Sequence, residues 1–283
     1  MSIRTLAVVC TAAAAWSAPA YAQPEPEQPA APVQPAAAPH RSLYFRAGAA
    51  LVAPISSSKE MSLSDVQGPA TLAIQNGPIA GSGASVESAT IPAIIVGLVL
   101  PFGNRRWSLE TILGVPFTVK FQATGSLANM SIAPTALGLP TGVGPLGPEL
   151  GEAKAIPPLV TLVYQLREAG MLRPYLGAGF AVLFAYDAHV TNPMLTAVAE
   201  PEMKIDPAPG IVAQGGLDVR LWKSVYARLD VKFIGLMNAH AEVRHIQVET
   251  PGLPLFEHVE VGTAKMDITV NPLIVQAGVG VDF

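Results

Sequence analysis

The chain has 283 residues, is 50% hydrophobic and only 13% charged, and carries a formal net charge of −4. Soluble domains are about one-quarter charged, so this chain has about half the usual charged fraction. A net negative charge argues against nucleic-acid binding, which favours a basic surface.

The first 22 residues have the pattern of a secretory signal peptide. Arg4 precedes the apolar run LAVVCTAAAAW, and Ala20 and Ala22 occupy the small-residue positions of a cleavage site. The run is too short to cross a bilayer as a helix. Cleavage after Ala22 would lower the net charge to about −5 and remove Cys10, the only cysteine. The mature chain would then have no disulfide and no cysteine metal site.

Residues 23–41 form a Pro/Ala-rich segment that begins QPEPEQPAAPVQPAAAP. Recurrent proline predicts an extended, flexible tether outside the folded domain. A plain linker is the simplest interpretation, and contact with peptidoglycan or a periplasmic partner is the alternative.

From residue 42 to residue 283 the chain alternates between strand-like runs and joins. No mature segment has the ~18 consecutive apolar residues of a membrane helix. Each run is long enough for a transmembrane strand, which needs roughly 9–11 residues. We expect eight strands, at residues 43–54, 89–100, 106–119, 155–167, 172–186, 210–222, 225–238 and 265–283.

The joins alternate in length. Three are short: PFGNRR, EAGM and Lys223-Ser224. The others are long and rich in Gly, Pro, Ser and Asn, as loops are; they cover residues 55–88, 120–154, 187–209 and 239–264. Short turns at one end and long loops at the other are typical of outer-membrane barrels. The sequence therefore predicts an all-β fold, an eight-stranded antiparallel transmembrane β-barrel with short periplasmic turns and long extracellular loops.

The last run, AKMDITVNPLIVQAGVGVDF, has period-2 amphipathicity and ends on Phe283. In a membrane both edges of such a strand must pair, so we expect it to close against the first strand. Aromatic residues gather near both strand ends, and we expect them to form two interfacial belts. The expected belts are Tyr44, Phe45, Phe102, Trp107, Tyr175, Trp222, Tyr226 and Phe283 at the short-turn end, and Phe117, Phe121, Phe184 and Tyr186 at the other.

Charged residues follow the same alternation. In 225–238 the apolar residues share one face, and Arg228, Asp230 and Lys232 share the other. A charge facing lipid costs about 2–4 kcal/mol near the midplane, so the charged face must be the inner one. The inward charges cluster toward the periplasmic end and mix in sign. We expect a periplasmic plug of Arg46, Glu110, Arg173, Asp218, Arg220, Arg228, Asp230 and Asp282.

Above the plug, inward residues turn apolar, which predicts an apolar lumen that opens to the outside. The expected lining is Val52, Ile112, Ala181, Leu183, Ile234, Leu236 and Ile274. An ionic plug in a small barrel either only stabilises the interior or also blocks straight passage, and both interpretations stay open.

Proline lacks the backbone N–H that donates a hydrogen bond in a β-ladder, so it loosens the pairing between strands. Five prolines in the outer half either mark strand ends or weaken a seam in the wall. The candidates are Pro92, Pro116, Pro157, Pro158 and Pro272.

Several segments carry a family resemblance: YFRAGAALVAP, LETILGVPF, IPPLVTLVYQL and RPYLGAGFAVLF, with the PFGNRRW turn and the terminal GVGVDF. In this order they resemble the outer membrane protein W (OmpW) family, which includes AlkL-type alkane importers. The resemblance covers residues 42–283 and implies an eight-stranded barrel with a hydrophobic channel, a periplasmic barrier and a lateral exit. Pro116 matches the family's proline after the aliphatic run of the third strand. The tether and the Gly/Pro-rich segment 120–154 depart from the family pattern.

We therefore expect a bacterial outer-membrane channel for passive uptake of small hydrophobic molecules, which leave sideways above the plug. A structural, adhesive or receptor barrel without transport is the alternative. An enzyme is not expected, because His189, His240, His245 and His258 fall in predicted loops and form no catalytic set. We expect no cofactor and no metal. The expected partners are outer-membrane lipid, small hydrophobic ligands and, through the C-terminal strand, the barrel-assembly machinery, with no nucleic acid.

Overall fold

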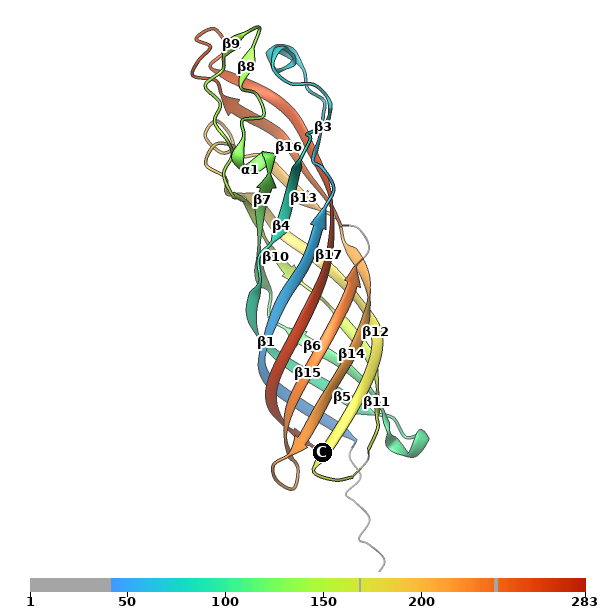
Figure 1. The fold of residues 1–283 in the computed structure, drawn as a ribbon. Helices are drawn as coiled ribbons and strands as arrows, with labels where there is room; N and C mark the ends of the chain where they lie inside the picture. The colour runs from blue at the N-terminus through green and yellow to red at the C-terminus, as the bar shows by residue number, and fades with distance from the viewer. Residues whose placement is uncertain (1–41, 168, 237–238) are drawn as a thin grey trace, which may run out of the picture. The chain divides into compact units, whose positions relative to one another are not determined.

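In the computed structural model, the structure describes residues 42–167, 169–236 and 239–283. The predicted signal peptide (1–22) and tether (23–41) lie outside these ranges and stay predictions. Within the described residues, eight strands form a closed antiparallel ring in which each pairs with two neighbours (Figure 1). In ring order they are β1 (Leu43–Ser58), β5 (Ala89–Val99), β6 (Trp107–Gly114), β11 (Leu159–Gln165), β12 (Leu172–Val190), β14 (Ala208–Arg220), β15 (Val225–Leu236) and β17 (His258–Asp282).

The last strand closes on the first, as the alternating terminus predicts. β1 and β17 stay in register from Tyr44↔Asp282 to Ser58↔Ile268. Their ends are held by reciprocal backbone hydrogen bonds: the Leu43 amide donates to the Phe283 carbonyl (3.2 Å), and the Phe283 amide donates to the Leu43 carbonyl (2.8 Å). The C-terminus lies at the short-turn end of the ring (Figure 1).

The inside-outside alternation is confirmed on β15. Leu229 and Phe233 are 55% and 43% exposed and point away from the ring, whereas Arg228 and Asp230 between them are buried. Because side chains of a strand alternate faces, one apolar outer surface and one filled interior follow from the same sequence.

Two predicted strands are each broken by proline. The run 106–119 divides into β6 and β7 (Phe117–Gly125), with Pro116 in the break. The run 155–167 divides into β10 (Glu149–Ile156) and β11, separated by Pro157 and Pro158. Proline cannot donate to a ladder, which explains why both strands stop at these positions.

The segments predicted as long loops contain further strands, which build an extension beyond the ring (Figure 1). Gly, Pro and Ser favour turns, but the residues between them alternate and pair with strands that run on from the ring. The extension includes β7 and β10, together with β2 (Ser62–Ser64), β3 (Gly77–Pro78), β4 (Ser82–Val86), β8 (Thr135–Ala136), β9 (Leu139–Pro140), β13 (Glu202–Ile205) and β16 (Ala239–Glu249).

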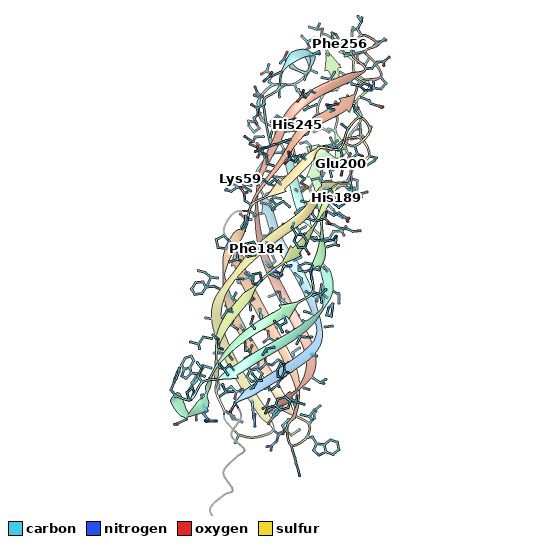
Figure 2. All side chains as sticks on the ribbon, turned by 180° about the vertical axis from the view of Figure 1, so that it is seen from behind. Lys59, Phe184, His189, Glu200, His245 and Phe256 are labelled. Atoms are coloured by element: carbon cyan, nitrogen blue, oxygen red, sulfur yellow. The ribbon has the colours of Figure 1, made fainter. Side chains whose placement is uncertain are left out.

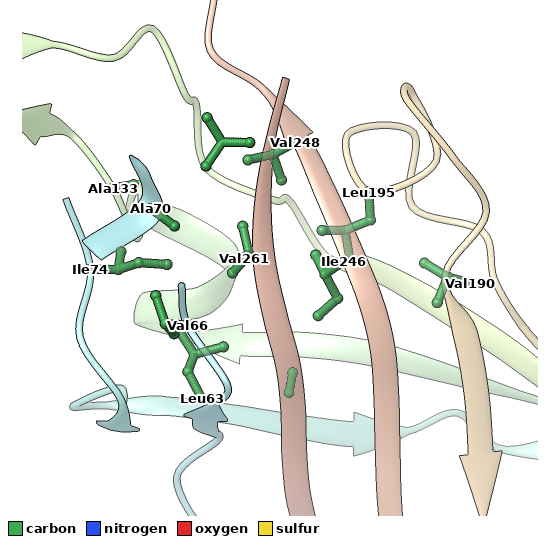
Figure 3. Close-up of a cluster of buried hydrophobic side chains, with 12 residues drawn as sticks. Leu63, Val66, Ala70, Ile74, Ala133, Val190, Leu195, Ile246, Val248 and Val261 are labelled. Atoms are coloured by element: carbon green, nitrogen blue, oxygen red, sulfur yellow. The ribbon is translucent and has the colours of Figure 1, made fainter. Parts of the chain in front are cut away.

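The extension has its own apolar core. Leu63, Val66, Ile246, Val248 and Val261 lie together there (Figure 3), and each is at most 7% exposed. Burial of these apolar side chains stabilises the paired strands of the extension. The predicted loop histidines lie on this extension, and Figure 2 shows His189 and His245 between the ring and Phe256 near the tip.

The remaining elements are short helical turns: η1 (Gly68–Leu72), η2 (Gly103–Arg105) and α1 (Ser126–Asn129). Within the residues that the structure describes, no helix has the length and apolar character to cross a membrane.

Candidate functional site

A cluster of charged side chains fills the lower interior of the ring, next to the short turns. Seven of the eight predicted plug residues belong to it, and Lys232 joins them. We call this set the plug: Arg46, Glu110, Arg173, Asp218, Arg228, Asp230, Lys232 and Asp282.

Arg228 is the centre of the plug. Its Nη1 donates to Glu110 Oε1 at 2.7 Å, and its Nε and Nη2 donate to the two oxygens of Asp218 at 2.7 and 3.1 Å. The guanidinium also lies 4.5 Å from the centre of the Tyr175 ring. All three charged side chains are at most 1% exposed. This planar, bidentate geometry is the arrangement that arginine favours with carboxylates.

A second group forms around Asp230, on the cavity side of Arg228. Lys232 Nζ and the Tyr175 hydroxyl both donate to Asp230. Gln214 Nε2 donates to Asp230 Oδ2 and to Glu110 Oε2, each at 2.8 Å. Gln214 therefore connects the two carboxylates and joins the two groups into one network.

The periplasmic end of the plug is formed by Arg46, Arg173 and Asp282. Arg46 Nη2 donates to Asp282 Oδ1 at 2.6 Å and lies 3.4 Å from Asp218 Oδ2, while Arg173 Nη1 lies 3.3 Å from Asp282 Oδ2. Both guanidinium groups stack on Tyr226, at 5.3 and 4.5 Å from its ring centre.

The plug is electrically balanced. It holds four cations, Arg46, Arg173, Arg228 and Lys232, and four anions, Glu110, Asp218, Asp230 and Asp282. Buried charges are tolerated when each is paired and hydrogen-bonded, whereas removing one partner of a buried pair costs about 3–5 kcal/mol. The network therefore fills the lower interior of the ring, and the loss of any one of its charges would destabilise the fold.

Three tyrosines predicted for the interfacial belt lie inside the ring instead. Tyr44, Tyr175 and Tyr226 are at most 2% exposed. Tyr44 donates to Glu110, and Gly97 makes room for its ring, since a Cβ on Gly97 would lie 2.0 Å from Tyr44 Cζ. The alternation of the strands could have predicted this inward position, because each tyrosine lies two residues from an inward arginine and therefore on the same face. Phe45, Phe102, Trp222 and Phe283 are exposed, as the belt requires.

The prediction for Arg220 is wrong. It shares the inward parity of Asp218, but it is the last residue of β14 and is exposed. Beyond the end of the ladder its side chain reaches solvent, where a charge needs no buried partner.

Above the plug the interior is apolar. A cavity of about 110 Å³ lies there, floored by a buried cluster of Ala50, Ala93, Leu159, Ala181, Val212, Ile234 and Ile274. Six predicted lumen residues belong to this cluster or pack against it: Val52, Ile112, Ala181, Leu183, Ile234 and Ile274. The side chain of the seventh, Leu236, lies outside the described residues.

Apolar lining continues from this cavity into the extension. A second cavity there shares Phe121, Ala241 and Ile268 with the first. It is also lined by Met61, Met203 and Met266, whose flexible thioethers adapt to irregular shapes. Part of the apolar core shown in Figure 3 lines this upper cavity, including Leu63, Ile246, Val248 and Val261.

The wall of the lower cavity has a gap in its hydrogen bonding. The β6–β11 ladder ends at Thr111↔Val160, and the β7–β10 ladder begins at Phe117↔Ala155. The unpaired stretch between them contains three of the predicted seam prolines, Pro116, Pro157 and Pro158. We call this unpaired stretch the wall gap. Gly114, Val115, Phe117 and Pro157, which border it, all line the cavity.

The other two seam prolines lie elsewhere. Pro92 is exposed on β5 and remains paired with Ala49 of β1, one residue beyond the end of the β5–β6 ladder at Ala93↔Gly114. Pro272 lies opposite Pro54, just beyond the Phe233↔Leu273 pair where the β15–β17 ladder ends. Pro92 therefore borders the wall gap, and Pro272 marks a separate break.

Comparison with known proteins agrees with this architecture. The model of the OmpW family matches residues 40–283. The crystal structure of the outer membrane protein OprG from Pseudomonas aeruginosa is similar, with 20% identity, a TM-score of 0.63, and coverage of 86% of this chain and 96% of that one.

Two further solved structures are similar at lower scores. Outer membrane protein AlkL in lipid bilayers has 18% identity and a TM-score of 0.49, with 89% of this chain and 95% of that one covered. Outer membrane protein W of E. coli has 15% identity and a TM-score of 0.43, with 86% and 98% covered. A search of curated proteins found no similar sequence. The family match spans the whole ring and its extension, and the chain therefore belongs to the OmpW family of eight-stranded barrels of the bacterial outer membrane.

Proposed function

We propose that this protein is a channel for passive uptake of small hydrophobic molecules, which enter from outside and leave sideways into the membrane above the plug. No chemical transformation is part of this proposal. The main support is the division of the interior into two parts: the charge-balanced plug, and above it an apolar cavity with the wall gap.

The plug makes straight passage unfavourable for an apolar molecule. Passing it would separate Arg228 from Glu110 and Asp218, and each broken buried pair costs about 3–5 kcal/mol. In the cavity, by contrast, apolar surface leaves water and gains about 25 cal/mol per Å². An apolar ligand is therefore stabilised above the plug and opposed by it.

The wall gap offers an exit of low cost. Opening a paired strand would break ladder hydrogen bonds, but Pro116, Pro157 and Pro158 leave few to break here. Beside the gap, Leu113 is 56% exposed and does not line the cavity, while Val115, which does line it, is 61% exposed. A ligand that passes here stays in apolar surroundings throughout.

The cavity is tested by placing a charge on its lining. Leu183→Glu adds a carboxylate to the apolar wall, and Leu183→Met keeps the wall apolar at similar volume. Heat-modifiable mobility on a gel first establishes that both variants are folded. Uptake of a hydrophobic fluorescent probe into cells should then fall at least tenfold in Leu183→Glu and stay near the wild-type level in Leu183→Met. Unchanged uptake by Leu183→Glu would favour a structural or receptor barrel without transport.

The exit is tested by filling the wall gap. A Cβ on Gly114 meets no atom within 4 Å, so the side chain of Gly114→Leu begins in open space. Gly235→Leu is the matched control, since a Cβ there meets only Phe233 at 3.8 Å. We expect Gly114→Leu to slow probe uptake severalfold and Gly235→Leu to leave it unchanged. Equal uptake by both variants would remove the wall gap as the exit.

A further inference from the structure

Three apolar residues lie between the upper cavity and the lower one. Phe121, Ala241 and Ile268 line both cavities, so a passage from one cavity to the other is bordered by these three side chains. They come from different parts of the wall, since Phe121 is on β7, Ala241 on β16 and Ile268 on β17. We call Phe121, Ala241 and Ile268 the neck.

The neck is closed by packing. Phe121 and Ala241 pack against a buried cluster of Ala84, Met266 and Ile268, each at most 8% exposed. Within the described residues, β10, β12 and β13 separate β7 from β16 along the hydrogen-bonded wall. The cluster therefore brings together side chains from distant parts of the wall, at the level where one cavity ends and the other begins.

Phe121 is the part of the neck that can move most easily. It is predicted for the outer aromatic belt, but it lies inside, where it is half-buried and lines the bore. An aromatic side chain changes direction by rotating about its side-chain bonds, without movement of the strand. The neighbouring Met61 and Met266 have flexible thioethers that adapt to a displaced ring, and Ala84 and Ala241 are small.

We propose that the Phe121 ring gates the neck and selects ligands by their cross-section, so that unbranched alkyl chains pass and rigid, wide hydrocarbons do not. This inference rests on the proposed function and specifies its ligand class. A flexible chain can enter end first once the ring rotates. A rigid cage must also displace Ile268, which is 3% exposed, and a close-packed interior resists such a displacement.

Decane and adamantane test this inference. They have the same number of carbon atoms and no polar group, but decane is a thin flexible chain and adamantane is a rigid cage. Uptake of each hydrocarbon into cells that produce the full-length protein is measured by gas chromatography, and the rate in cells without the protein is subtracted. In the wild type we expect decane to enter severalfold faster than adamantane.

Variants of Phe121 separate the gate from the rest of the bore. Phe121→Ala removes the ring, so adamantane uptake should rise severalfold while decane uptake changes little. Phe121→Trp enlarges the ring and should slow both hydrocarbons. Phe121→Leu is narrower than the ring but stays large and apolar, so it provides the same test if heat-modifiable gel mobility shows that Phe121→Ala does not fold.

Phe184→Ala is the matched control. It removes the same ring from β12, but Phe184 is 46% exposed and is not among the described residues that line the two cavities. The ratio of decane to adamantane uptake should therefore stay at the wild-type value.

Each outcome decides a different point. If the wild type accelerates both hydrocarbons equally, the neck does not select by width, which overturns this inference and leaves the proposed function intact. An unchanged uptake ratio in the folded Phe121 variant, or an equal change in Phe184→Ala, also overturns it. If decane enters no faster than in cells without the protein, both the inference and the proposed function fail.

Discussion

Replacing Arg228 with methionine tests whether the plug is dry. The change removes the partner of Glu110 and Asp218, which Arg228 contacts at 2.7 Å each, and leaves two carboxylates that are at most 1% exposed. Methionine keeps much of the side-chain volume, so lost packing contributes little.

The magnitude follows from the burial of these groups. An uncompensated buried charge costs about 3–5 kcal/mol, against at most ~1 kcal/mol for an exposed pair. Arg46 still contacts Asp218 at 3.4 Å and Tyr44 still donates to Glu110, so the lower end of that range is expected. We predict that the free energy of unfolding falls by about 3 kcal/mol.

Urea unfolding in lipid vesicles, followed by tryptophan fluorescence, measures this change. Arg220→Met on the adjacent strand is the control, because Arg220 is exposed and its loss should change stability by no more than ~0.5 kcal/mol. If the two variants unfold alike, water hydrates the carboxylates and the interior is not the dry plug described here.

Two further changes have defined outcomes. In Gly97→Ala the added methyl would lie 2.0 Å from Tyr44 Cζ, so the ring must shift away from Glu110; we expect about 1–3 kcal/mol of destabilisation in urea unfolding, and no change would show that Tyr44 adapts freely. On the extension, the hydrogen bond from Lys59 lowers the pKa of Asp267 below its usual 3.8, with a further contribution from His240. A lowered pKa stabilises the fold above pH 3.8 and loses that contribution as the pH falls through the lowered value. Lys59→Met should raise the pKa of Asp267 in an NMR titration, and an unchanged pKa would contradict the contact.

The interior of the ring could be predicted from alternation alone. On β15 every second residue from Tyr226 to Ile234 points inward, and the change from charge at Asp230 and Lys232 to apolar at Ile234 marks the top of the plug. A one-residue error in register would have exposed these charges to lipid, which is why the pattern is so informative.

Other features could not be predicted from residue types alone. Tyr44 and Tyr175 were assigned to the membrane interface because aromatic residues favour it, yet the hydrogen bonds to Glu110 and Asp230 hold them inside. The extension was predicted as loops because local Gly and Pro content was weighed without the distant partners that pair it, such as Ser64 of β2 with Thr263 of β17. The buried oxygens without a partner were missed for the same reason, since an atom such as Gln276 Oε1 is recognised as unpaired only when all its neighbours are known.

The most direct test of the account follows where a hydrophobic probe goes. The protein is reconstituted in sealed liposomes, and a probe that fluoresces differently in lipid and in water is added outside. If the plug blocks the bore and the wall gap is the exit, the protein accelerates arrival of the probe in the bilayer while the internal water stays unlabelled and ion conductance stays at the protein-free level. Probe or ions reaching the internal water at a protein-dependent rate would show a path through the plug and contradict the account.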